Sequence, residues 1–160
     1  MGTVVMVCGM PGAGKTVLAR RLEDGRDTVR LCPDEWLLAM GLDPHDGPLR
    51  RRLERTMWRH VLALADLGLT VVADFGFWTR PERTRCRDQV RSAGHDVVLY
   101  ALDVPLEERW ARIERRNAAA GVVVITREQL EDYERWWQRP DEAEIAGYDT
   151  GGITGGPAAE

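Results

Sequence analysis

The stretch GMPGAGKTVLARRL, residues Gly9–Leu22, decides the fold of this chain. It follows the apolar, β-branched run Thr3–Cys8 and contains the pattern GxxxxGK[ST] of a phosphate-binding loop. In such a loop the glycines let backbone N–H groups curl around phosphate oxygens, and the helix that follows adds a favourable dipole. The pattern requires a strand before the loop and a helix after it, and the sequence provides both.

Lys15 is the only lysine among the 22 basic residues of the chain. A compact ammonium fits a phosphate pocket that a wide guanidinium fork would fill. We expect Lys15 to reach the β- and γ-phosphates of ATP and the Thr16 hydroxyl to bind Mg²⁺. The sequence therefore predicts ATP and Mg²⁺ as cofactors. The predicted nucleotide-binding residues are Gly9, Met10, Pro11, Gly12, Ala13, Gly14, Lys15, Thr16 and Val17.

Strand-like and helical patterns alternate along the chain, which predicts an α/β fold: a three-layer P-loop NTPase fold with a central parallel sheet and a helical lid. The expected strands are Thr3–Cys8, Thr28–Leu31, Leu69–Ala73 and Val97–Leu102. The expected later helices are Leu49–Leu67, Pro81–Ala93, Pro105–Ala120 and one from Thr126 to about Gln138, opened by a Thr126–Gln129 capping box. We predict a kinase domain over residues 1–146, a lid over about 112–126, and a loose tail over 147–160 without a fifth strand.

Composition limits the functions that the chain can have. The net charge of −4 argues against general affinity for nucleic acid, although a local basic groove remains compatible with it. No apolar run is long enough to cross a membrane, and no charged leader precedes the first strand, so we expect a cytoplasmic protein without a membrane partner. Three widely spaced cysteines and three histidines without a spaced pair predict reduced thiols and no histidine metal site.

Two carboxylates follow or end predicted strands, at the edge of the sheet where α/β proteins bind ligands. Asp34 follows the second strand in CPDEW, and Asp74 ends the third in ADFGFW. One carboxylate can accept a proton from an attacking hydroxyl, while the other can hold Mg²⁺ or orient the acceptor. The alternatives are a helix N-cap for Asp34 and a loop tie for Asp74. A guanine-specificity NKxD sequence is absent, which disfavours a GTPase.

The pattern around these residues, over about residues 3–145, resembles the small P-loop kinases that include chloramphenicol phosphotransferase, the zeta-type toxins and the kinase domain of phage polynucleotide kinase. The resemblance continues through ADFGFWTRPERTRCRDQVRSAGHDVVLYALDVPLEERWARIERRN, with Arg83 opening a helix. It implies phosphoryl transfer from ATP to a hydroxyl, with Asp34 as general base. It leaves the acceptor open, because members of the group act on antibiotics, nucleotide sugars and nucleic-acid ends.

A cationic group is expected near the migrating phosphoryl group, whose charge spreads over its equatorial oxygens. Arg109, Arg112 and Arg116 share one flank of the helix that leads into the lid, and we predict Arg112 and Arg116 to be catalytic. The alternative is a solvated face paired with neighbouring glutamates. Members of the group often carry a further arginine within the lid, where this chain has three alanines at 118–120.

The predicted acceptor site lies between the two strand-end carboxylates and is flanked by Trp36 and Trp78, which either pack against the acceptor or against a lid. The predicted substrate-binding residues are Asp34, Trp36, Asp74, Trp78 and Arg83. Four arginines lie opposite the apolar stripe of the helix expected from Leu49: Arg51, Arg52, Arg55 and Arg59. We expect a solvated face there; the alternative is a basic wall for an anionic acceptor or a nucleic-acid end.

The sequence thus favours an ATP-dependent kinase that phosphorylates a hydroxyl of a small molecule, such as an antibiotic or another specialised metabolite. One alternative is a polynucleotide 5′-hydroxyl kinase, although the net negative charge makes nucleic acid the less favoured partner. The other is a switch module that binds ATP without an acceptor. The variant Asp34→Asn distinguishes a kinase from a switch module, because only a kinase needs a proton acceptor for its activity. The sequence does not indicate an oligomeric state.

Overall fold

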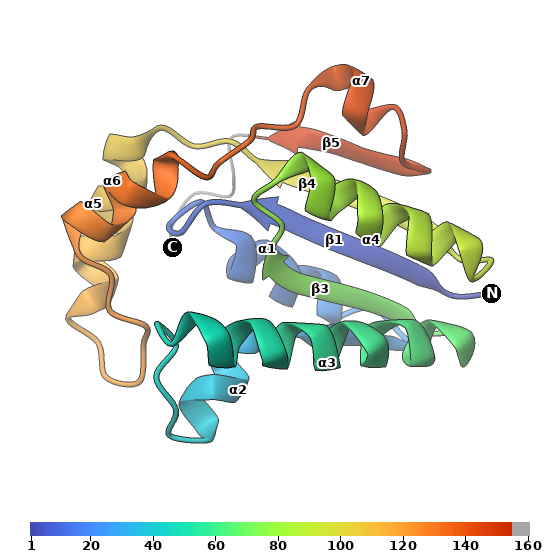
Figure 1. The fold of residues 1–160 in the computed structure, drawn as a ribbon, viewed down its shortest axis with the longest axis horizontal. Helices are drawn as coiled ribbons and strands as arrows, with labels where there is room; N and C mark the ends of the chain where they lie inside the picture. The colour runs from blue at the N-terminus through green and yellow to red at the C-terminus, as the bar shows by residue number, and fades with distance from the viewer. Residues whose placement is uncertain (155–160) are drawn as a thin grey trace.

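A computed structural model describes residues 1–154 as a central sheet of five parallel strands with helices on both faces (Figure 1). The strands lie in the order β2-β3-β1-β4-β5, and every neighbouring pair is parallel. Their bounds are β1 Thr3–Gly9, β2 Thr28–Leu31, β3 Thr70–Gly76, β4 Asp96–Leu102 and β5 Thr150–Thr154. The carboxyl ends of all strands therefore meet at one edge of the sheet, which is where open α/β sheets bind ligands.

Helices connect the strands and cover both faces of the sheet. Helices α3 and α4 lie side by side on one face, α1 covers the other, and α5 and α6 lie beyond the carboxyl ends of the strands, on the left of Figure 1. The helices are α1 Lys15–Glu23, α2 Pro33–Ala39, α3 Gly47–Asp66, α4 Arg80–Ser92, α5 Leu106–Asn117, α6 Arg127–Glu134 and α7 Glu142–Ile145.

The central strand β1 is buried on both faces, because its side chains alternate between two cores. Val4 and Met6 point into a core with Met57 of α3 and Val90 of α4. Val5 and Val7 point into the opposite core, under α1. Burial on both sides explains why β1 is a continuous apolar run rather than an alternating one. It also fixes the phosphate-binding loop, which leaves the end of this strand.

The fold predicted from the sequence is confirmed for its sheet and its main helices. The four expected strands appear as β1 to β4, each within three residues of its predicted bounds. The capping box at the start of α6 is present in both directions: Thr126 accepts from the Gln129 amide, and the Gln129 side chain accepts from the Thr126 amide. Cys8, Cys32 and Cys86 are buried and free, as expected.

The expectation of a loose tail without a fifth strand is wrong for residues 150–154, which form β5 at the edge of the sheet. Val98 pairs with Thr150, and Leu102 pairs with Thr154. A Cβ added at Gly151 would lie 2.0 Å from the Leu99 carbonyl oxygen, so only glycine lets this strand approach β4. The glycines of this segment therefore allow β5 to form its ladder with β4. The rest of the predicted tail, 155–160, lies outside the described residues.

The segment predicted as a lid, 112–126, comprises the end of α5 and the loop that leads to α6. The Asn117 side chain holds this loop: its amide nitrogen donates to the Ile125 carbonyl at 2.8 Å, and its oxygen accepts from the Ile125 amide at 3.2 Å. A small separate core of Ile113, Ile125 and Leu130 joins α5, the loop and α6. The lid segment therefore packs on its own core, apart from the two cores that flank the sheet.

Candidate active site

The loop between β1 and α1 has the geometry of a phosphate cradle. Gly12 and Gly14 both have positive φ, 79° and 95°, and a Cβ added at Gly12 would lie 2.7 Å from the Arg109 carbonyl oxygen. Glycine is required at both positions, because other residues rarely adopt this backbone and Gly12 has no space for a side chain. The predicted nucleotide-binding stretch, Gly9–Val17, thus spans the end of β1, the loop and the first turn of α1. The α1 amino terminus points into the loop, which suits an anion.

Lys15 bends back over this loop, and its Nζ donates to the Met10 carbonyl oxygen at 3.0 Å. Burial lowers the pKa of the ammonium, while the nearby carboxylates of Asp74 and Asp34 act in the opposite direction. The Lys15 side chain is therefore a buried cation placed beside the loop, with two anions within electrostatic reach.

The Thr16 hydroxyl and the Asp74 carboxylate are joined directly. Thr16 Oγ1 donates to Asp74 Oδ2 at 3.0 Å, and Arg30 Nη1 lies 3.5 Å from the same oxygen. Burial raises the pKa of Asp74, and the charges of Lys15 and Arg30 oppose that rise. β3 continues past Asp74 to Gly76, so the carboxylate faces the phosphate loop rather than tying down a turn of its own.

Asp34 lies in the first turn of α2 and is not the helix cap, since the N-cap residue is Cys32 and makes no side-chain cap bond. The Asp34 carboxylate forms an ion pair with Arg50 of α3, and Arg50 also pairs with Glu54 at 2.8 Å. Sequence reasoning missed Arg50, because it considered only the four arginines opposite the apolar stripe of this helix. The i,i+4 spacing of Arg50 and Glu54 is a signal for the second pair, but no local pattern indicates the pairing with Asp34.

The two arginines predicted to be catalytic extend from α5 toward the loop and toward Asp34. Arg112 Nη1 lies 3.4 Å from the Gly12 carbonyl oxygen and 3.5 Å from that of Ala13, and it also pairs with Glu108. Arg116 donates to the Val123 carbonyl at 3.2 Å. Burial lowers the pKa of Arg116, and the charge of Asp34 opposes that shift.

Arg109, on the same flank of α5, has a different environment. It is buried, its Nε donates to the Val104 carbonyl at 2.9 Å, and its Nη2 pairs with Glu134 of α6. Its role is to join α5 to α6 behind the phosphate loop.

The prediction that Arg83 binds substrate is wrong. The Arg83 side chain is fully buried, and it donates to both carboxylate oxygens of Glu144 and to the Phe77 carbonyl. Every one of these partners belongs to the interior of the fold, so no acceptor can reach the guanidinium. The sequence could not show this, because Glu144 lies 61 residues away in α7.

The two tryptophans predicted to flank the acceptor differ in environment. Trp36 is 45% exposed on α2, two residues beyond Asp34. Trp78 packs on Tyr133 of α6, with ring centroids 5.0 Å apart, and the charges of Arg50 and Asp34 act on the Tyr133 hydroxyl. Tyr133, which sequence reasoning did not single out, is therefore a candidate neighbour of this site through its contact with Trp78.

A strand, a glycine-rich loop and a helix that opens with lysine and threonine, set at the middle of a five-stranded parallel sheet, define a P-loop domain of the kinase type. Residues 4–140 match the model of the AAA_33 family, described as an AAA domain, and the chain belongs to this family. The predicted membership of a small P-loop kinase family is confirmed. Comparison with curated proteins found no match.

Solved structures share the fold at low identity. A chain of the Pnkp1/Rnl/Hen1 complex is 22% identical with a TM-score of 0.62, over 69% of this chain and 38% of that one. An unliganded sugar kinase from Janibacter sp. HTCC2649 is 20% identical with a TM-score of 0.61, over 96% and 85%. The Mycobacterium tuberculosis APS kinase CysC, in complex with AMPPNP and APS, is 22% identical with a TM-score of 0.59, over 95% and 88%. This chain spans less than half of the RNA-repair chains that it matches, 38% and 43%.

Among residues 1–154, no helix combines the length and the apolar character that a membrane-spanning segment needs.

Proposed function

We propose that this protein transfers the γ-phosphate of ATP to a hydroxyl group of a small-molecule acceptor. The observation that carries the proposal is a set of contacts at the carboxyl edge of the sheet. Thr16 of the phosphate loop donates to Asp74 at 3.0 Å, Arg112 lies 3.4 Å from the Gly12 carbonyl oxygen, and Asp34 is held by its ion pair with Arg50. A hydroxyl acceptor needs a carboxylate near the phosphate-binding loop to take its proton, whereas a simple nucleotide switch does not need one.

The donor side of the site is the stretch Gly9–Val17. Its backbone N–H groups and the Lys15 ammonium fit the β- and γ-phosphates. The hydroxyl of Thr16 and the carboxylate of Asp74 are hard oxygen donors 3.0 Å apart, a set that fits Mg²⁺. When bound, Mg²⁺ neutralises charge that develops on the phosphate oxygens.

The acceptor hydroxyl attacks the γ-phosphorus in line with the departing ADP oxygen. A new oxygen–phosphorus bond forms as the bond to the β–γ bridging oxygen breaks, and Asp34 takes the hydroxyl proton. Lys15, Arg112 and Arg116 offset the charge on the migrating group. Asp34 begins the reaction paired with Arg50, which holds the carboxylate in place from α3.

The acceptor hydroxyl belongs beside Asp34 in this proposal, with Trp36 two residues further along α2 and the Trp78–Tyr133 pair as candidate aromatic neighbours. Flat apolar side chains beside a charged group are typical of sites for small organic molecules. The similarity to solved structures of a sugar kinase and an APS kinase agrees with a small acceptor.

The proposal is tested with ATP labelled at the γ-phosphate and a panel of hydroxylated compounds. The wild type should move label to an organic product at a rate that depends on the acceptor, whereas Lys15→Met should not. Release of labelled phosphate to water only, unchanged by every acceptor, would contradict a kinase. An oligonucleotide with a free 5′-hydroxyl belongs in the panel, since preferred labelling of that compound would favour a polynucleotide kinase instead.

A further inference from the structure

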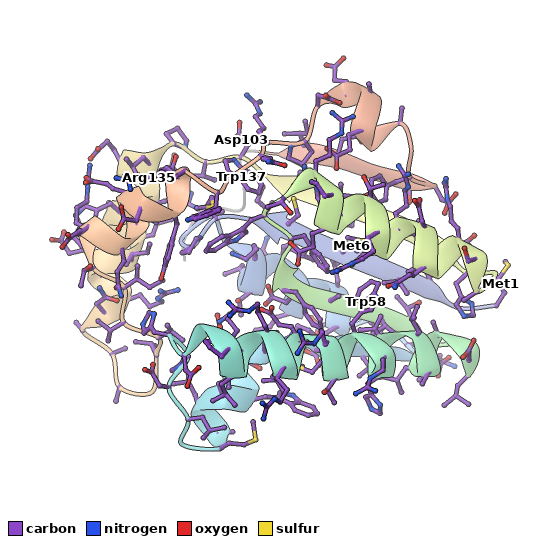
Figure 2. The ribbon with its side chains drawn as sticks, viewed as in Figure 1. Met1, Met6, Trp58, Asp103, Arg135 and Trp137 are labelled. Carbon is purple, nitrogen blue, oxygen red and sulfur yellow. The ribbon has the colours of Figure 1, made fainter. Side chains whose placement is uncertain are left out.

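A cleft of about 650 Å³ lies between α3 and α4, above the end of β3 and outside the phosphate loop. Its floor is aromatic. Phe75 and Phe77 are stacked with ring centroids 5.7 Å apart, and Trp58 of α3 meets both rings edge-on. Trp58 lies between α3 and α4 in Figure 2, and its indole Nε1 donates to Gln89 of α4 at 2.6 Å. Trp58 and Phe75 are only partly buried, whereas Phe77 is 2% exposed and belongs to the core beneath them.

Five arginines line this cleft: Arg51, Arg52, Arg55 and Arg59 from α3, and Arg85 from α4. Within residues 1–154 none of these five has an ion-pair partner, although arginines elsewhere in the fold, such as Arg30 and Arg83, are paired. Arg26, Arg115 and Arg116 also lack an ion-pair partner among residues 1–154, but these three lie outside the cleft. Arg59 donates to Thr56 Oγ1 at 3.5 Å, and the remaining N–H donors of the five cleft arginines are suited to an external anion.

Two glutamates, Glu54 and Glu82, also line the cleft, so its lining carries five arginines and two acids in a chain whose net charge is −4. Burial raises the pKa of both glutamates, while the positive charges of Arg50 on Glu54 and of Arg85 on Glu82 oppose that rise. Glu54 connects the cleft to the candidate active site, because it pairs with Arg50 and Arg50 pairs with Asp34. Glu54, at the edge of the cleft, therefore lies one helical turn from Arg50, the ion-pair partner of the proposed base.

We propose that this cleft binds the anionic part of the acceptor, and that the acceptor is a small organic phosphate with a flat ring and a free hydroxyl. The inference rests on the proposed kinase function. The phosphate is held by the guanidinium forks, the ring lies on the aromatic floor, and the hydroxyl points to Asp34. The bound phosphate takes no part in bond making, since the transferred group comes from ATP alone.

Size favours a small molecule over a nucleic-acid strand. The volume falls within the range of about 300–1,000 Å³ that is typical of sites for small organic ligands. The row from Arg51 to Arg59 covers eight residues, or about 12 Å along the helix axis, which one ring and one phosphate can span. A strand of nucleic acid needs a charged track that continues past the end of such a cavity.

Binding is tested first, without ATP and without catalysis. Phenyl phosphate carries a ring and a phosphate but no alcohol, and its affinity is measured by calorimetry. The double variant Arg55→Ser/Arg59→Ser should weaken this binding by about tenfold or more, because two charged donors are lost. The control Arg26→Ser/Arg135→Ser makes the same charge change on residues outside the cleft and should bind phenyl phosphate as the wild type does. Equal binding by both double variants overturns the proposal.

Turnover is tested with hydroxylated ring compounds in pairs that differ only by a phosphate group. The phosphorylated member of a pair should have a kcat/KM at least about tenfold higher, because its KM is lower. The double variant Arg55→Ser/Arg59→Ser should remove that preference and leave the affinity for ATP unchanged. Equal kcat/KM for both members overturns the proposal, as does a strong preference for an oligonucleotide. Arginine-dependent binding of phenyl phosphate with no transfer to any acceptor would support the anion site and contradict the kinase function, so the two failures are distinguishable.

Discussion

Arg83 and Glu144 form a two-pronged ion pair in the interior, with Nε–Oε1 and Nη2–Oε2 distances of 2.6 and 2.9 Å. Both side chains are buried, and the pair joins α4 to the short helix α7 that precedes β5. Tyr148 adds a hydrogen bond to the Arg83 carbonyl at 3.3 Å. The edge strand of the sheet is therefore held through α7 as well as by its own ladder with β4.

Removal of one partner should be strongly destabilising. Glu144→Ala leaves a guanidinium buried without its anion, and we expect a loss of about 3–5 kcal/mol in the free energy of unfolding. For a chain of this size that is a fall of roughly 10 °C in Tm. Thermal unfolding measures it, with the exposed Glu142→Ala in the same short helix as control. Equal Tm values for the two variants would show that the pair does not hold α7.

Lys15→Met should weaken ATP binding and abolish transfer by at least ~100-fold, because a buried cation beside the phosphates is replaced by an apolar side chain. Lys15→Arg keeps the charge but brings a wider fork into a loop where Gly12 already has no space, and we expect it to be defective too. Calorimetry with a non-hydrolysable ATP analogue measures the binding. Wild-type affinity for the ATP analogue in Lys15→Met would show that Lys15 does not bind the nucleotide.

Arg50→Ala should lower kcat/KM by about tenfold without changing the affinity for ATP, since it frees the Asp34 carboxylate from its fixed position. Arg50→Lys keeps a cation at this position and should recover part of the loss. Steady-state kinetics with the acceptor varied measures both variants. A loss of ATP affinity in Arg50→Ala would mean that Arg50 serves the donor side.

The three cysteines should be nearly inert in the native protein. Burial raises the pKa of Cys8, Cys32 and Cys86 to about 12, so at pH 8 only about one thiol in 10⁴ is ionised at each position, compared with about a quarter for a free cysteine. Reactivity should rise as the pH increases towards that value. With a chromogenic disulfide reagent at pH 8, all three thiols should react slowly in the native protein and rapidly in urea. A thiol that reacts at the free rate in the native state would contradict this burial.

The donor half of the candidate site could be proposed from the sequence, because that half is local. The glycines, Lys15 and Thr16 lie within eight residues, and their roles depend on one loop between a strand and a helix. The acceptor half was harder to predict, since it is assembled from separate elements. Asp34 and Asp74 were recognisable from strand-end positions, but Arg50 reaches Asp34, and Tyr133 reaches Trp78, only through the packing of α3 and α6.

The errors have a common physical origin in long-range contacts. Arg83 opens a helix near the site in sequence, but its side chain turns inward to a glutamate 61 residues away. β5 has two glycines and little alternation, and its pairing depends on a close approach to Leu99 that no local pattern encodes. The cleft between α3 and α4 likewise requires two helices to lie side by side, so the sequence alone left a solvated face and a basic wall as alternatives for its α3 arginines.

The most direct measurement of the central claim is the effect of Asp34→Asn on two quantities determined side by side: the rate of γ-phosphate transfer to an acceptor and the dissociation constant of ATP. Loss of the proton acceptor should lower kcat by about 10²–10⁴-fold and leave the affinity for ATP within about twofold. Transfer at the wild-type rate in Asp34→Asn, with nucleotide binding intact, would show that another group takes the proton and would contradict the account.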